Sequence, residues 1–130
     1  FEHLSKSEMK SALGLIYFYL IKDGTLRIAV PDGNHPNPIY RKHTGINGIG
    51  ADASDHKQFI TYEYLKSVLE KCGFKCVLRE GYLSDGRLVN EKLTSELGFI
   101  IRSRNNKSFN MKYGWDFESA NSSLIVDAYK

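Results

Sequence analysis

Residues 20–32 read LIKDGTLRIAVPD, and this stretch decides the fold class. Within it, residues 25–30 form a short, mostly apolar and β-branched run in which Arg27 is the only charge, a pattern typical of a strand covered on both faces. Gly24 stands where a left-handed residue would end a helix before that strand. A helix and a strand, followed by a second helix and strand, predict an α/β layered fold with parallel strand pairing.

Helical and strand periodicities continue on both sides of this stretch. Ser5 and Glu8 form a capping box for a first helix, and Thr61 is a candidate N-cap for a second helix that Gly73 ends. Apolar residues recur at helical spacing in both helices: Met9, Ala12, Leu13, Ile16, Tyr17 and Leu20, then Tyr62, Leu65, Val68, Leu69 and Cys72. Residues 74–80 predict a strand near a sheet edge, residues 84–86 a turn and residues 123–129 a final strand.

Composition limits the class of protein. The chain has 130 residues, the size of one domain, residues 1–130. Its net charge of +3 comes from Lys and Arg scattered among acids, so no nucleic-acid partner is expected. The longest apolar stretch, residues 12–21, is too short to span a bilayer, so no membrane partner is expected. Cys72 and Cys76 lack further ligands at zinc spacing, and without a secretory signal they predict buried thiols in a cytoplasmic protein.

The connection after the first strand is the candidate binding region. Residues 31–60 begin with a long loop, to about Asp55, that carries Gly, Asn, Pro and His without periodicity. Ligands of open α/β sheets bind beyond the carboxyl ends of the strands, and this loop leaves such an end. We therefore expect a substrate pocket here, with these candidate substrate-binding residues: Pro31, Asp32, His35, Tyr40, Asp55 and His56.

Other interpretations of these polar residues stay open. In one alternative, His35 and His43 are solvated loop residues. In another, Asp55 caps a turn and His56 hydrogen-bonds the backbone, so that both have structural roles. The loop histidines and Asp32 match no compact ligand motif, so no metal site is expected. The glycines of residues 45–50 follow no strand directly and do not form a dinucleotide fingerprint.

Several segments, taken in order, carry a resemblance to a known family. They are FEHLS at residues 1–5, LIKDGTLRIAVPD at residues 20–32, DHKQFIT at residues 55–61, the helix that ends in CGF at residues 65–74, and SSLIVDA at residues 122–128. This ordered set covers most of the chain. It resembles the second half of a class I methyltransferase that uses S-adenosylmethionine, in particular a type 11-like bacterial subgroup of predicted methyltransferases.

The resemblance implies a partial Rossmann-like methyltransferase fold. Residues 25–30 would be its fifth strand, residues 74–80 its sixth, and residues 123–129 its seventh, antiparallel and inserted between the other two. The first four strands and the glycine-rich cofactor unit would be absent, which implies an incomplete form with weak or no binding of S-adenosylmethionine. The fifth strand would keep an unpaired edge, which predicts a homodimer through an exposed sheet edge.

The resemblance also implies site residues for methyl transfer to a small polar acceptor. Glu2 and His3 match the family's position beside the methionine end of the cofactor, as cofactor-binding and catalytic residues. A base is needed when the acceptor is a hydroxyl or an amine that must lose a proton. Tyr113 and Trp115 are candidates to cover the acceptor pocket. An alternative for Glu2 and His3 is that they merely lead into the first helix, since an acid near a helix start is stabilising in its own right. An alternative for the whole chain is a non-catalytic, self-associating interaction module.

Overall fold

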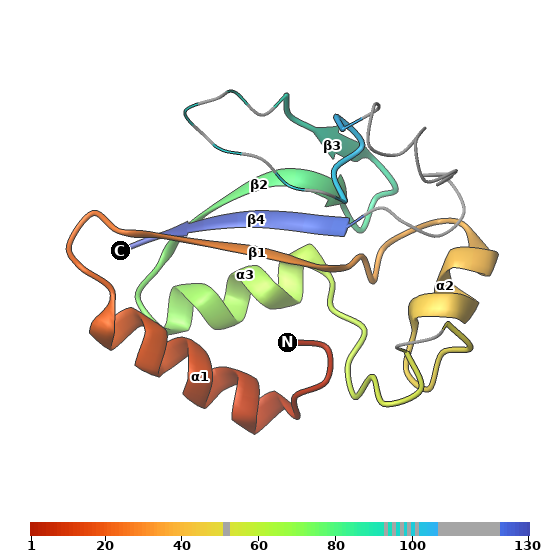
Figure 1. The fold of residues 1–130 in the computed structure, drawn as a ribbon, viewed down its shortest axis with the longest axis horizontal. Helices are drawn as coiled ribbons and strands as arrows, with labels where there is room; N and C mark the ends of the chain where they lie inside the picture. The colour runs from red at the N-terminus through yellow and green to blue at the C-terminus, as the bar shows by residue number, and fades with distance from the viewer. Residues whose placement is uncertain are drawn as a thin grey trace.

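The computed structural model describes residues 1–50, 53–92, 94, 96, 98, 100, 102–106 and 123–130. Its elements in chain order are α1 (Lys6–Tyr19), β1 (Thr25–Pro31), α2 (Pro38–Thr44), α3 (Tyr62–Lys71), β2 (Lys75–Tyr82), β3 (Leu88–Asn90) and β4 (Ser123–Tyr129). The helices α1 and α3 lie on the same side of one four-stranded sheet, and α2 lies beyond the end of β1 (Figure 1). The described chain is therefore of mixed α/β class.

The strand β4 organises the sheet, whose order is β1-β4-β2-β3. It pairs antiparallel with β1, from Thr25 opposite Tyr129 to Pro31 opposite Ser123, and antiparallel with β2 on its other side. The strands β1 and β2 thus run in the same direction with β4 between them, as expected for the last strand. The predicted parallel pairing is wrong for the described sheet, because β4 separates the two strands that α3 connects.

The two edges of the sheet differ. After β2, the N–H of Gly86 donates to the carbonyl oxygen of Leu83 at 2.9 Å, and Gly86 has a φ of 83°, which makes the predicted turn. The short β3 then pairs with the carboxyl end of β2 only, from Glu80 to Tyr82, so most of β2 lies near an edge, as predicted. At the opposite edge, no described strand pairs with the outer side of β1.

The hydrophobic core lies between the sheet and the helices α1 and α3. It contains Met9, Leu13, Ile28, Val30, Ile60, Leu65, Leu69, Phe74, Leu124, Val126 and Ala128. Because strand side chains alternate between faces, β1 and β4 each send every second residue into this core. Burying one large apolar side chain stabilises a fold by about 1.5–3 kcal/mol. The apolar residues at helical spacing are the ones that α1 and α3 turn toward this core, so their spacing predicted both helices correctly.

The starts of the two long helices follow their sequence signals. The hydroxyl of Ser5 accepts from the N–H of Glu8, and the carboxylate of Glu8 accepts from the N–H of Ser5 at 2.7 Å, which completes the capping box. The side chain of Thr61 caps α3, and Gly73 follows that helix with a φ of 105°. Each of these bonds satisfies a backbone group that has no partner within the helix.

Two local features differ from the expectation. Asp23, and not Gly24, takes the left-handed conformation after α1, with a φ of 61°. Gly24 is required for a different reason, because a Cβ there would lie 2.8 Å from the carbonyl oxygen of Ile21. The loop after β1 also contains α2, which begins with Asn37 as N-cap and Pro38 in its first turn. Its seven residues are too few to show helical periodicity.

The remaining expectations have mixed outcomes. Cys72 and Cys76 are free thiols but are half-buried rather than buried. Tyr113 and Trp115 lie outside the described residues, so their proposed place over a pocket stays a prediction.

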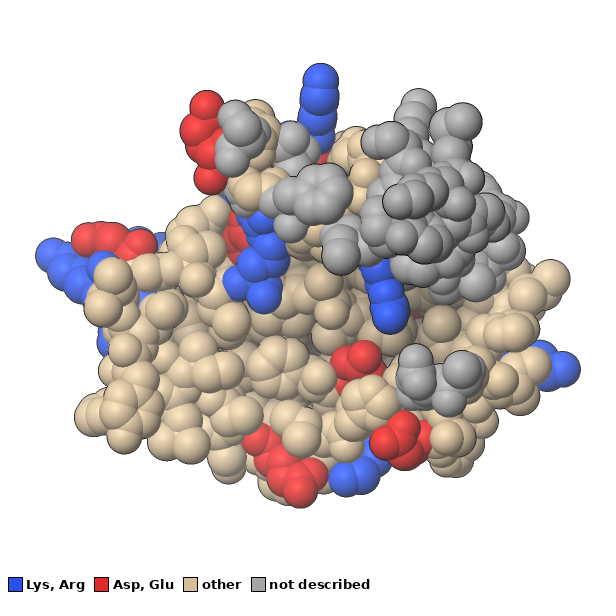
Figure 2. Space-filling model, viewed as in Figure 1, with Lys and Arg blue, Asp and Glu red and all other residues tan. Residues whose placement is uncertain are grey.

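In the described part of the chain, no helix combines the length and the apolar character that a membrane crossing requires. On the face drawn in Figure 2, basic and acidic side chains are interspersed.

Candidate functional site

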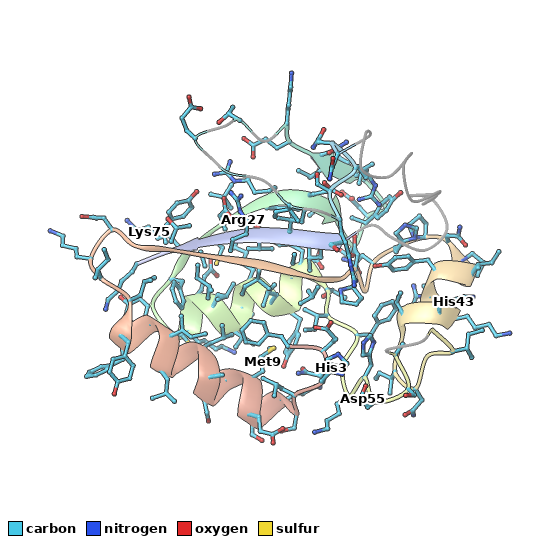
Figure 3. The ribbon with its side chains drawn as sticks, in the orientation of Figure 1. His3, Met9, Arg27, His43, Asp55 and Lys75 are labelled. Atoms are coloured by element: carbon cyan, nitrogen blue, oxygen red, sulfur yellow. The ribbon has the colours of Figure 1, made fainter. Side chains whose placement is uncertain are left out.

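The N-terminal turn lies side by side with the residues that precede α3. The N–H groups of Lys57 and Gln58 both donate to the carbonyl oxygen of Glu2, at 2.8 and 3.1 Å. The side-chain amide of Gln58 donates to the carbonyl oxygen of Leu4 at 2.8 Å. These bonds fix two segments that are far apart in the sequence, and Figure 3 shows His3 and Asp55 next to each other at their junction.

Three side chains that can bind metals or move protons meet at this junction. Glu2, His3 and His56, here called the His-Glu cluster, each bring one side-chain N or O atom within 4.8 Å of the other two. The Nε2 atom of His3 lies 3.9 Å from Oε1 of Glu2, and the rings of His3 and His56 meet edge to face with centroids 4.6 Å apart. The side chain of His3 is 43% exposed and His56 is 6% exposed, so the cluster extends from solvent into the protein.

A second hydrogen bond orients each imidazole of the cluster. Nδ1 of His3 lies 2.9 Å from Oδ1 of Asp55, and Nδ1 of His56 lies 2.8 Å from the carbonyl oxygen of Thr44. An ionised carboxylate and a carbonyl oxygen only accept, so Nδ1 donates in both rings and Nε2 of each neutral ring keeps its lone pair. The alternative in which His56 hydrogen-bonds backbone is confirmed, and Asp55 bonds the His3 ring.

The Glu2 carboxylate of the cluster is ionised at neutral pH. Burial raises the pKa of Glu2, but the backbone N–H of Glu2, the amino group of Phe1 and His3 outweigh it, so this pKa lies below its ordinary value. Oε2 of Glu2 accepts from the Phe1 amino group at 3.0 Å, while Oε1 faces His3. An ionised Glu2 and the Asp55 carboxylate therefore flank the imidazoles, an arrangement that can accept a proton or hold a cation.

The sequence indicated these residues but not that they meet. It placed Glu2 and His3 beside a cofactor, and Asp55 and His56 beside an acceptor, whereas the structure brings all four together. Comparisons with models of protein families, with curated proteins and with solved structures gave no match. The interpretation of the cluster therefore depends on its geometry and on the sequence resemblance.

The candidate residue Asp32 joins the ends of two strands. It is fully buried just after Pro31, the last residue of β1, which is buried as well. Its Oδ2 accepts from the N–H of Tyr82 at 2.7 Å, and its Oδ1 accepts from the N–H of Asn34 at 3.0 Å. Burial raises the pKa of Asp32 above its ordinary value, against these two backbone hydrogen bonds. Both oxygens of Asp32 thus hold backbone in place.

The candidates His35 and Tyr40 form a buried aromatic pair beside Asp32. Their rings stack with centroids 3.9 Å apart, and the Tyr40 hydroxyl accepts from the N–H of Asp32 at 2.8 Å. Nδ1 of His35 accepts from the N–H of Asn37 at 3.1 Å, so its proton is on Nε2. His35 is 1% exposed, and burial lowers its pKa to about 4, reinforced by Arg104. The alternative that His35 is solvated is wrong.

An ion network on the sheet face opposite the core was not foreseen. The Asp127 side chain is 1% exposed and accepts from Nη2 of Arg27 at 2.7 Å and from Nε of Arg79 at 2.9 Å. Arg79 also donates to Glu91 at 2.6 Å and to the hydroxyl of Tyr129 at 2.7 Å. Burial raises the pKa of Asp127, but hydrogen bonds from both guanidinium groups hold it below its ordinary value. This network is satisfied internally, which indicates a structural role.

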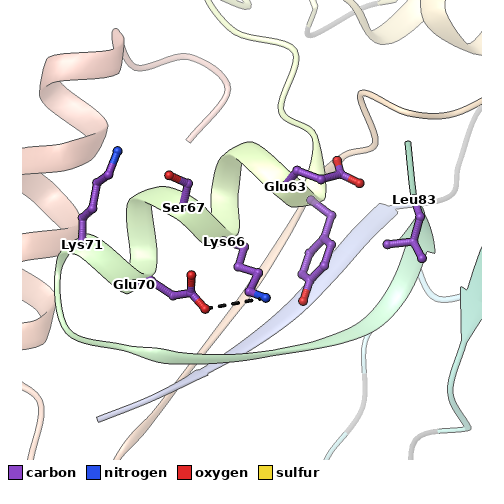
Figure 4. A pocket seen from close by; sticks show the side chains of 7 residues that line it. Glu63, Lys66, Ser67, Glu70, Lys71 and Leu83 are labelled. Carbon is purple, nitrogen blue, oxygen red and sulfur yellow. Dashed lines mark ion pairs between the residues drawn. The ribbon is translucent and has the colours of Figure 1, made fainter. Parts of the chain in front are cut away.

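A hollow of about 540 Å³ lies on the outer side of α3. It is lined by Tyr62, Glu63, Lys66, Ser67, Glu70, Lys71 and Leu83. Figure 4 shows that Lys66 and Glu70 lie next to each other, with a charge separation of 3.7 Å, while Ser67 and Lys71 project from another side of the helix. Glu63 already accepts from the side chain of Asn34 and the N–H of Ser84. The His-Glu cluster is therefore the better candidate site.

Proposed function

We propose that this chain is the C-terminal part of a class I methyltransferase with a partial Rossmann-like fold, which transfers a methyl group from S-adenosylmethionine to a small polar acceptor in the cytoplasm. The observation that carries the proposal is the sheet itself. The resemblance implied that the last strand is antiparallel and inserted between two strands of equal direction, and β4 has this place between β1 and β2. This order is not the result of chain proximity, since β4 is remote in sequence from β1.

The cofactor supplies an electrophilic methyl group on a sulfonium, so the protein has to align the acceptor and remove its proton. Glu2 fits a place beside the methionine end because its side chain is 19% exposed and carries a carboxylate, which can accept from an ammonium group. The glycine turn and the acidic residue that grip such a cofactor belong to the first half of the family's domain.

In this proposal His3 is the general base. The Asp55 carboxylate accepts from Nδ1 of His3, which leaves the lone pair on Nε2 for the proton of an acceptor hydroxyl or amine. Asp55 also stabilises the imidazolium that forms. His56 packs its ring against His3 and limits the rotation of the base. Pro31, Asp32, His35 and Tyr40 shape the acceptor side by holding the loop that leaves β1.

The first test is calorimetric titration of S-adenosylmethionine into protein expressed from the complete reading frame and into the 130-residue chain. We expect the complete protein to bind and the short chain to bind weakly or not at all. In the complete protein, His3→Gln should lower transfer of labelled methyl groups to small phenols and amines without changing cofactor affinity. His43→Gln, outside the cluster, is the matched control. A complete protein that does not bind S-adenosylmethionine overturns the proposal.

A second candidate function is a self-associating interaction module. Two observations favour it: the outer edge of β1 has no described partner strand, and α1 and the turn after it expose Leu15, Phe18, Tyr19 and Ile21. An edge strand with free backbone groups can pair with a second copy of itself. Light scattering of the 130-residue chain tests this function, because a chain that stays monomeric at every concentration excludes the module. The N–H of Lys130 donates to Gly24, and ladder bonds alternate along an antiparallel strand, so the N–H of Ala29 points to the outer edge of β1 and should gain amide-exchange protection in a dimer.

A further inference from the structure

The His-Glu cluster has the chemical composition of a metal site. It contains two imidazoles and one carboxylate, a ligand set used for zinc and for other divalent first-row transition ions. The three residues do not form a compact sequence motif for metal binding, because Glu2 and His3 lie at one end of the chain and His56 lies in the segment before α3. The sequence for this reason predicted no metal site.

The separations between the candidate ligand atoms are close to those of a bound ion. Ligands about 2.0–2.1 Å from a tetrahedral zinc lie about 3.3 Å from one another. In the cluster, Nε2 of His3 and Oε1 of Glu2 are 3.9 Å apart, and all three ligand atoms lie within 4.8 Å of one another. Small movements of the partly exposed Glu2 and His3 side chains, which are 19% and 43% exposed, would close this gap.

The hydrogen bonds around the cluster point to the same conclusion independently. Histidines that bind metals donate their other N–H to a carboxylate or a backbone carbonyl, which fixes the tautomer and the ring orientation. His3 donates to the Asp55 carboxylate and His56 donates to the carbonyl oxygen of Thr44. Structural hydrogen bonding alone accounts for the two Nδ1 atoms. It does not account for the approach of one potential ligand atom from each of Glu2, His3 and His56 to within 4.8 Å of the other two.

We propose that the His-Glu cluster binds one divalent transition-metal ion of the Zn²⁺ class, through Oε1 of Glu2 and Nε2 of His3 and of His56. Three protein ligands leave a coordination position open, and the exposed His3 side of the cluster gives solvent and small molecules access to it. An ion at this place can bind an oxygen atom of a ligand and lower the pKa of that group. The metal site goes beyond methyl transfer and does not depend on it. A bound ion would occupy Nε2 of His3, the atom that serves as a base in the metal-free protein.

The test uses the 130-residue chain without a histidine tag, stripped of metals with a chelator. Titration with Co²⁺ should give one ion per chain and a visible absorption stronger than that of the aqueous ion, and Zn²⁺ should displace it. Asp55→Ala should weaken binding by about 10-fold to 100-fold, because it removes the partner that orients His3. Glu2→Gln and His3→Gln should weaken it further, since each removes a ligand.

His43→Gln is the matched control, because His43 lies in α2, is half-exposed and is not part of the cluster. It should bind Co²⁺ as the parent chain does. His56 is buried, so circular dichroism must first show that His56→Gln folds; if it does not fold, Glu2→Gln and His3→Gln decide the question. Parent-like binding by both of those variants, or the spectrum of the aqueous ion with the parent chain, overturns the metal site. Binding is measured without S-adenosylmethionine, so this result is separate from the test of methyl transfer.

Discussion

Replacement of Asp127 by Asn should strongly destabilise the fold. The substitution keeps the shape of the side chain but leaves Arg27 and Arg79 without their shared counter-charge in the protein. Removing one member of a buried ion pair costs about 3–5 kcal/mol. We expect about 3 kcal/mol, the lower end of that range, because Arg27 is 21% exposed and Arg79 keeps Glu91 and the hydroxyl of Tyr129.

Urea unfolding followed by circular dichroism measures this loss directly, and a loss of that size lowers the Tm by about 10 °C in a domain of this length. The pH dependence gives a second reading. The folded pKa of Asp127 is depressed, so its stabilisation is present above the unfolded value of 3.8 and disappears as the pH falls through the folded pKa. The difference between the parent and Asp127→Asn should therefore shrink in acid.

Asp85→Asn is the matched control. Asp85 and Arg87 form an ion pair of 3.4 Å in the turn before β3, and both side chains are well exposed. Exposed pairs contribute little, so this variant should unfold at the same urea concentration as the parent. Equal midpoints for Asp127→Asn and Asp85→Asn would refute the reasoning, because they would mean that burial adds nothing to the Asp127 network.

Three further predictions concern other parts of the fold. The ring signals of His35 should not titrate in NMR spectra between pH 5 and pH 8, because burial lowers its pKa to about 4. The unfolded ring takes up a proton at about pH 6.5, so the stability of the fold should decrease as the pH falls from there toward 4. A titration midpoint near 6.5 in the folded state would contradict the burial of His35. Gly81→Ala should cost more than about 1 kcal/mol, because Gly81 has a φ of 145° and a Cβ there would lie 2.7 Å from Cδ1 of Leu124; Gly86→Ala, at a φ of 83° but with open space, is the control and should cost less. Ser5→Ala should cost about 1 kcal/mol in urea unfolding through loss of the N-cap of α1, while Ser5→Asp, which can still accept the bond, should keep most of the stability.

Features set by neighbouring residues were predictable from the sequence. The capping box at Ser5, the N-cap at Thr61 and the turn at Gly86 depend on residues within one turn of one another, and the structure contains all three. Helix α2 escaped prediction because it spans only seven residues, so its single signal was the pair Asn37 and Pro38. Where two residues can serve the same turn, as Asp23 and Gly24 can, local propensity does not decide which one takes the left-handed conformation.

Features set by distant residues were predictable only in part. Residue patterns indicated the three main strands, but the antiparallel place of β4 followed from the resemblance and not from periodicity. Arg27 stood out as the one charge in its strand, yet its partner Asp127 lies 100 positions away, and no local rule connects them. The same holds for His3 and His56, whose approach depends on hydrogen bonds between the N-terminal turn and residues 57 and 58.

The central position of β4 has a consequence for synthesis of the protein. The two strands on either side of it, β1 and β2, leave the ribosome well before residues 123–129, and each then exposes the row of backbone groups that β4 later covers. Strand pairings between segments so far apart form slowly, and the nascent chain is open to aggregation during that interval. A premature stop codon before residue 123 would therefore remove the central strand of the sheet. It would leave the edges of β1 and β2 that β4 covers without a partner strand.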